Sequence, residues 1–143
     1  MNLYAESSAV LVWLLGQPGS DAARTALSEA ELVVASDLTL LECDRALIRG
    51  QTVGEITETA AADRRAVLHA AATNWHLLRI GGEIVDRARR PFPAEPIRTL
   101  DALHLASALA ARAAVPGLAL LSLDERIRKA AAHLGLQAIP ADL

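Results

Sequence analysis

The chain has 143 residues and a mass of 15.1 kDa, which predicts one domain over residues 1–143 with enough length to bury a sizeable core. Apolar residues make up 52% of the sequence, which excludes an intrinsically disordered chain, and aromatic residues only 3%. The formal charge of −3 excludes binding to nucleic acid by overall charge alone. Any such binding has to use a local basic surface or bound cations.

Cysteine content and hydropathy bear on the cellular compartment. Cys43 is the only cysteine, which excludes an internal disulfide framework and a cysteine-rich zinc site. The first residues lack the basic segment and long apolar stretch of a signal peptide. No apolar run approaches the ~20 residues that cross a bilayer. We therefore expect a cytoplasmic protein with no membrane partner.

Short apolar segments alternate with helical ones along the chain. Strands are predicted over residues 2–5, 32–36, 76–80, 118–122 and 136–140. Helices are predicted from the first serines to about residue 15, then to about residue 30, and over 37–50, 54–75, 82–90, 99–115 and 124–135. Ser7 or Ser8 is expected to cap the first helix, Ser36 the third, and Gly50 to follow the end of the third.

This alternation predicts an α/β fold: a three-layer α/β/α sandwich whose central, mostly parallel sheet has four to five short strands. In such sheets, ligands bind outside the carboxyl ends of the strands. Four carboxylates are expected near that edge. Glu6 follows the first strand, Glu42 lies two turns into the helix after the second, Asp101 lies in the first turn of the long helix, and Asp124 follows the 118–122 strand.

A gathering of carboxylates without thiolate or histidine ligands is typical of a site for a hard cation. Mg²⁺ and Mn²⁺ favour oxygen ligands, activate water and stabilise the charge that develops on a phosphoryl oxygen. Without a cation, acids held close together repel one another strongly. The joint placement of these side chains, rather than any one of them, therefore indicates a metal site.

Local structure offers another explanation for two of the acids. Ser122 and Glu125 have the spacing of a capping box around Asp124, and Thr99 can cap the helix that carries Asp101. An aspartate in the first turn of a helix also favours the helix dipole. Both explanations stay open at this point.

Glu42 lies too far into its helix to serve the dipole. The alternative for this residue is a surface pair with Arg45 or Arg49, worth only ~0.2–0.5 kcal/mol.

Four segments in this order resemble the PIN-domain family, and within it the VapC-type toxins of bacterial toxin–antitoxin pairs: LYAESSAV, LTLLECDRAL, IRTLDALHLASAL and LLSLDERIRKAAAHLGL. The resemblance covers essentially the whole chain. It implies a Mg²⁺- or Mn²⁺-dependent endoribonuclease, a homodimer, and a small VapB-like antitoxin that inserts into the groove of the active site. The family's acids carry over to Glu6, Glu42, Asp101 and Asp124. Its accompanying hydroxyls carry over to Ser8 and Ser122, while Ser7 is assigned to the turn.

The first acid departs from the family pattern, because family members usually carry aspartate where this chain has Glu6. The extra methylene moves the carboxylate outward, and a displacement of about an ångström is enough to reduce turnover. This departure supports a second interpretation, a PIN-like module that binds RNA or a protein without cutting. We interpret Glu6, Glu42 and Asp101 as ligands of one ion, with Asp124 holding a second ion or a water.

Arginines near these acids are candidates for binding the RNA phosphates, because arginine binds phosphate with two parallel hydrogen bonds. Arg45, Arg98 and Arg126 are predicted to bind substrate; the alternative is that they neutralise the neighbouring carboxylates. His104 is predicted to be a packed, hydrogen-bonded histidine rather than a general base. A phospho-acceptor receiver domain is disfavoured, because Lys129 lies inside a helix rather than at the end of a strand.

Overall fold

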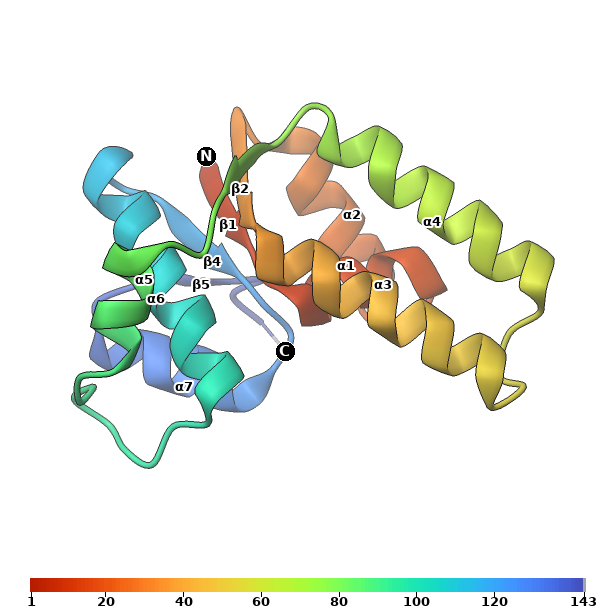
Figure 1. The fold of residues 1–143 in the computed structure, drawn as a ribbon. Helices are drawn as coiled ribbons and strands as arrows, with labels where there is room; N and C mark the ends of the chain where they lie inside the picture. The colour runs from red at the N-terminus through yellow and green to blue at the C-terminus, as the bar shows by residue number, and fades with distance from the viewer. Residues whose placement is uncertain (143) are drawn as a thin grey trace.

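A sheet of parallel strands runs through the centre of the structure, a computed structural model that describes residues 1–142 (Figure 1). The strands are β1 (Asn2–Ala5), β2 (Leu32–Ser36), β3 (His76–Leu78), β4 (Ala119–Leu121) and β5 (Ala138–Ile139). They lie in the order β3-β2-β1-β4-β5, and each neighbouring pair is parallel. The strand order therefore reverses between β1 and β4, and at such a point the connections on the two sides diverge and leave a crevice.

Helices cover both faces of this sheet and confirm the predicted three-layer α/β/α fold (Figure 1). One layer contains α1 (Ser7–Leu15), α2 (Ser20–Glu29), α3 (Asp37–Thr52) and α4 (Glu58–Ala72). The other contains α5 (Gly82–Ala88), α6 (Thr99–Ala114) and α7 (Glu125–His133). None of the helices within residues 1–142 is both long enough and apolar enough to cross a membrane.

The two cores follow from the alternation of side chains along each strand. Tyr4 and Leu120 pack on one face of the sheet, in the same cluster as Leu105 of α6. Their neighbours Leu3 and Ala5 belong to the clusters on the other face. Successive side chains of a strand point to opposite faces, so strands that are apolar throughout can be buried on both sides.

Two predicted helix boundaries are wrong. The third helix does not stop at Gly50 but continues to Thr52, and the glycine with a left-handed backbone is Gly54, at φ 80°. Gly50 lies inside the helix, where a Cβ would meet the side chain of Ile56 at 3.4 Å. Gly50 therefore does not terminate the helix. The predicted 54–75 helix is shorter, because its first turn begins at Glu58 after the cap Thr57.

Leu105 is fully buried between α6 and the sheet, so shortening its side chain tests the packing of this layer. We expect Leu105→Ala to lower the free energy of unfolding by about 2–5 kcal/mol, measured by urea denaturation. Leu100→Ala, in the same helix but at a leucine that is 48% exposed, is the matched control and should cost less than about 1 kcal/mol. Equal losses for the two variants would contradict this arrangement.

Candidate active site

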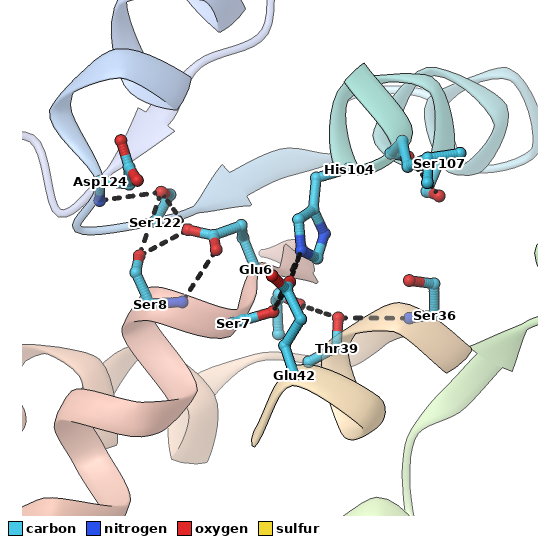
Figure 2. A network of polar contacts seen from close by, with 12 residues as sticks. Glu6, Ser7, Ser8, Ser36, Thr39, Glu42, His104, Ser107, Ser122 and Asp124 are labelled. Carbon is cyan, nitrogen blue, oxygen red and sulfur yellow. Dashed lines mark hydrogen bonds and ion pairs between the residues drawn. The ribbon is translucent and has the colours of Figure 1, made fainter. Parts of the chain in front are cut away.

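Polar side chains from both helical layers meet where the strand order reverses. Figure 2 shows Glu6 at the start of α1, Glu42 on α3, His104 on α6 and Asp124 at the start of α7, grouped around the carboxyl ends of β1 and β4. Parallel strands bring segments that are far apart in sequence to one edge, as the sequence predicts.

Glu6 is a nearly buried carboxylate, 4% exposed, held by three hydrogen-bond donors. Its Oε2 accepts from the backbone N–H of Ser8 at 2.8 Å. Its Oε1 accepts from the hydroxyls of Ser8 at 2.5 Å and Ser122 at 2.6 Å. A buried carboxylate requires such donors to replace its lost hydration. Glu6 is also the N-cap of α1, so the prediction that Ser7 or Ser8 caps this helix is wrong.

Ser8 and Ser122 also connect Glu6 to the segment after β4. The Ser8 hydroxyl accepts from the backbone N–H of Leu123 at 2.9 Å, and the Ser122 hydroxyl accepts from the N–H of Asp124 at 3.1 Å. The structure therefore places both serines beside the first acid. Their hydrogen bonds fix the start of α1 against the end of β4.

Glu42, on α3, receives two short hydrogen bonds on one oxygen. Its Oε1 accepts from the Ser7 hydroxyl at 2.6 Å and contacts His104 Nε2 at 2.5 Å. Burial alone would raise the pKa of Glu42, but the two hydrogen bonds and the charge of His104 together lower it below its ordinary value. Ser7 is thus a partner of Glu42 rather than a turn residue. Within residues 1–142 Glu42 forms no ion pair with Arg45 or Arg49.

His104 is packed and hydrogen-bonded, as predicted, and is 1% exposed. The sequence pattern did not predict the hydrogen-bond partners of His104. Its Nδ1 lies 3.0 Å from the hydroxyl of Tyr4, which lies 2.9 Å from the hydroxyl of Ser36. The only available signal was the spacing of three residues from Asp101, which puts both side chains on neighbouring positions of α6.

The trio of Ser7, His104 and Glu42 is not a hydrolytic triad. In such a triad the serine and the acid bond to opposite nitrogens of the imidazole. Here both Ser7, at 3.0 Å, and Glu42 lie on Nε2, while Tyr4 occupies Nδ1. The imidazole therefore has no free nitrogen with which to accept the serine proton. Ser7 is also buried and inaccessible to a substrate.

Asp101 lies in the first turn of α6, and Asp124 precedes the first turn of α7. Burial is the main cause that raises the pKa of Asp101, and the charge of Asp124 raises it further, against smaller opposing effects of Arg126, His104 and Arg98. Asp124 is the N-cap of α7 and accepts from the backbone N–H of Arg126 at 2.9 Å. The guanidinium Nη2 of Arg126 lies 3.6 Å from Oδ2 of Asp124.

Neither of the caps offered by the alternative local explanation is used. The residue that caps α7 is Asp124 and not Ser122, and α6 begins after Arg98 rather than after Thr99. Ser122 instead uses its hydroxyl on Glu6.

A cleft of about 600 Å³ adjoins Asp101. Arg98, Arg126 and Lys129 bring positive charge to its walls. Arg45 lines a different groove along α3 with Ile48, Arg49 and Val53. Of the three arginines predicted to bind substrate, the structure thus brings Arg98 and Arg126 together with Asp101 and separates Arg45 from the cleft.

One wall of this cleft is the loop before α6, and its conformation is fixed by internal contacts. The carboxylate of Glu95 accepts from the backbone N–H groups of Phe92 and Ile97, each at 2.8 Å. The guanidinium of Arg87 lies 4.2 Å from the centre of the Phe92 ring. A cation over an aromatic face is attracted to it, so the loop is held to α5.

The donor set suits a hard divalent ion. The acids supply oxygen ligands, and the charge of Asp124 acts on the pKa of both Glu42 and Asp101, so these three carboxylates lie within electrostatic reach of one another. In residues 1–142 no three histidine, cysteine, aspartate or glutamate side chains are grouped closely enough to form a ready metal cage. Any divalent ion bound here would therefore have to complete its coordination with water, which Mg²⁺ commonly does.

A parallel three-layer sandwich with carboxylates from separate segments at its switch point defines the class of small α/β proteins that bind ligands at the carboxyl edge of the sheet. Comparison with protein families shows which family of this class the chain belongs to. The model of the PIN domain matches residues 3–133, so the chain belongs to the PIN-domain family.

Relatives agree with this assignment. Ribonuclease VapC46 of Mycobacterium tuberculosis is 36% identical over 138 residues, covering 96% of this chain and 95% of the relative. The crystal structure of M. tuberculosis VapC20, described as a Sarcin-Ricin loop cleaving toxin, has a TM-score of 0.65 at 14% identity, over 90% of this chain and 94% of that one. VapBC2 of Rickettsia felis, bound to a DNA fragment from its promoter, has a TM-score of 0.63 at 9% identity, over 96% and 97%. The two structures support the fold alone.

Ser122→Ala tests the hydrogen bonding of the buried carboxylate of Glu6. The variant removes one donor from that carboxylate, and we expect the free energy of unfolding to fall by about 1–3 kcal/mol. Ser28→Ala, which removes an exposed hydroxyl bonded to a backbone carbonyl in α2, should change it by less than about 0.5 kcal/mol. Urea denaturation of both variants gives the comparison, and no difference between them would refute a stabilising role for the Ser122 hydroxyl.

Proposed function

We propose that this chain is a Mg²⁺- or Mn²⁺-dependent endoribonuclease that cleaves RNA phosphodiesters as the toxin of a type II toxin–antitoxin system. The relationship to Ribonuclease VapC46 over almost the whole chain supports the ribonuclease activity. The observation that carries the proposal is the gathering of carboxylates at the switch point of the sheet (Figure 2). Metal dependence follows from the chemistry of that donor set.

We assign Glu42, Asp101 and Glu6 to one divalent ion and Asp124 to a second ion or a water. A divalent ion in this crevice supplies an activated water and neutralises charge on the phosphoryl oxygens. The protein's own contribution is orientation. Ser8 and Ser122 hold Glu6 and connect it to the start of α7, while Ser7 and His104 hold Glu42.

The basic cleft beside Asp101 is the proposed path of the RNA backbone. Arg98 and Arg126 line it, and Lys129 adds a third positive charge one turn along α7. Guanidinium groups bind phosphates in a two-pronged manner. This local charge answers the objection raised by the net charge of −3, because phosphate contacts depend on the charge at the interface. Since Arg45 lies in another groove, we do not assign it a phosphate contact.

The proposal includes the partners and setting that the family implies: a VapB-like antitoxin, a homodimer, and a single domain that works in the cytoplasm. The antitoxin is what the family resemblance implies, and proteins with this fold include members of toxin–antitoxin assemblies. Besides VapBC2, a toxin–antitoxin complex from Klebsiella pneumoniae has a TM-score of 0.61 at 15% identity, over 88% of this chain and 89% of that one.

Asp101→Asn tests the catalytic role of the acid beside the cleft. We expect RNA cleavage to fall by about 100-fold or more, because the variant removes a charge that the transition state requires. Stability should be unchanged or slightly higher, since burial and the charge of Asp124 raise the pKa of Asp101 and disfavour its ionised form in the fold. Cleavage of a labelled RNA and thermal unfolding are the two measurements.

Asp63→Asn is the matched control, because this aspartate is exposed on α4 and should tolerate the same change without effect. Cleavage by Asp101→Asn at the wild-type rate would remove the mechanism. A wild-type chain that binds RNA but never cleaves it would instead support the RNA-binding module that the Glu6 position suggests.

Removal of divalent ions tests the cofactor. We expect excess EDTA to abolish RNA cleavage by the wild-type chain, and addition of Mg²⁺ or Mn²⁺ beyond the chelator to restore it, because in the proposed mechanism the divalent ion supplies the activated water. Far-ultraviolet circular dichroism in EDTA is the control for folding. Undiminished cleavage in EDTA would exclude metal dependence.

A further inference from the structure

Three buried polar side chains form a hydrogen-bonded chain that leads to Glu42. It runs from Ser36 through Tyr4 to His104, and each of these side chains is at most 1% exposed. Buried polar groups are costly unless every hydrogen bond is made. In a core otherwise built of Ala, Leu, Val and Ile, such a chain requires an explanation beyond packing.

The Glu42 carboxylate fixes the direction of one hydrogen bond in this chain, and the protonation state of His104 decides the others. The Glu42 carboxylate can only accept, so His104 Nε2 carries a proton and donates to it. Tyr4 keeps its phenolic proton, because burial, partly offset by neighbouring hydroxyls, raises its pKa to about 12. In a neutral imidazole the Tyr4 hydroxyl donates to Nδ1 and accepts from Ser36.

Two donors from different layers converge on a single oxygen of Glu42. Ser7 and His104 both bond to Oε1, and within residues 1–142 no hydrogen bond is made to Oε2. The side chain of Glu42 is 28% exposed, whereas that of His104 is 2% exposed. One carboxylate oxygen is therefore anchored in the protein while the other remains available to a ligand in the crevice.

We propose that His104 is a positioning residue for Glu42, and that Tyr4 sets the tautomer in which His104 performs this role. The inference rests on the proposed function, in which Glu42 binds the divalent ion. A free glutamate samples many rotamers, and ordering such a side chain costs up to ~2 kcal/mol. Anchoring Oε1 in advance removes this cost and presents Oε2 in one orientation. Groups that orient metal ligands in this way typically contribute ~10–100-fold to metal affinity.

The test is calorimetric titration of Mn²⁺ into the full-length protein without RNA. We expect His104→Ala to weaken Mn²⁺ binding by roughly 10–100-fold. His104→Gln should recover most of the affinity, because its side-chain amide can donate from near the position of Nε2. Tyr4→Phe, which keeps the ring but removes the donor to Nδ1, should weaken binding by a smaller factor and serves if His104→Ala fails to fold.

Leu105→Ala is the control for lost stability, because this buried leucine follows His104 in α6 and its side chain packs in the apolar core. It should lower the unfolding temperature and leave Mn²⁺ affinity unchanged. An equal loss of affinity in Leu105→Ala, or wild-type affinity in both His104→Ala and Tyr4→Phe, would refute the positioning role alone. Failure of the wild-type chain to bind Mn²⁺ would refute the metal-dependent function and the positioning role together.

Discussion

The hydrogen bond between Glu42 and His104 joins the two helical layers of the sandwich. Glu42 belongs to α3 on one face of the sheet and His104 to α6 on the other, and their side chains meet at 2.5 Å past the end of β1 (Figure 2). Hydrogen bonds to charged groups are about twice as strong as those between neutral groups. A contact between two site residues therefore links the two layers at the crevice.

Three of the four acids at this edge have neighbouring groups that stabilise their negative charge. Serine hydroxyls and a backbone N–H surround Glu6, and Ser7 and His104 serve Glu42. Backbone N–H groups at the start of α7 and the guanidinium of Arg126 serve Asp124. Asp101 is the exception, because burial and the neighbouring Asp124 raise its pKa despite the nearby cations. Among the four acids, the negative charge of Asp101, which borders the basic cleft, is thus the least stabilised by neighbouring groups.

The sequence predicts the strands and the common location of the acids because both depend on short-range patterns and on parallel topology. The predicted strand 32–36 coincides with β2, and Glu6 and Asp124 follow neighbouring strands as expected. The contact between Glu42 and His104 spans 62 positions, and no local pattern encodes a pairing at that separation.

Ser36 caps α3 as predicted, but the cap of α1 was mispredicted for a related reason. Several polar residues adjoin each helix start, and tertiary contacts decide between them. Ser8 and Ser122 bond to Glu6, and this leaves Glu6 and Asp124 themselves as the caps.

The loop that Glu95 and Arg87 hold in place has a thermodynamic consequence for whatever enters the neighbouring cleft. Contacts within the chain hold its backbone, so binding of a ligand in the cleft does not require that wall to become ordered. The conformational entropy lost on binding is then mainly that of the ligand. A rigid, extended ligand would therefore lose less conformational entropy on binding in this cleft than a flexible one, independently of charge.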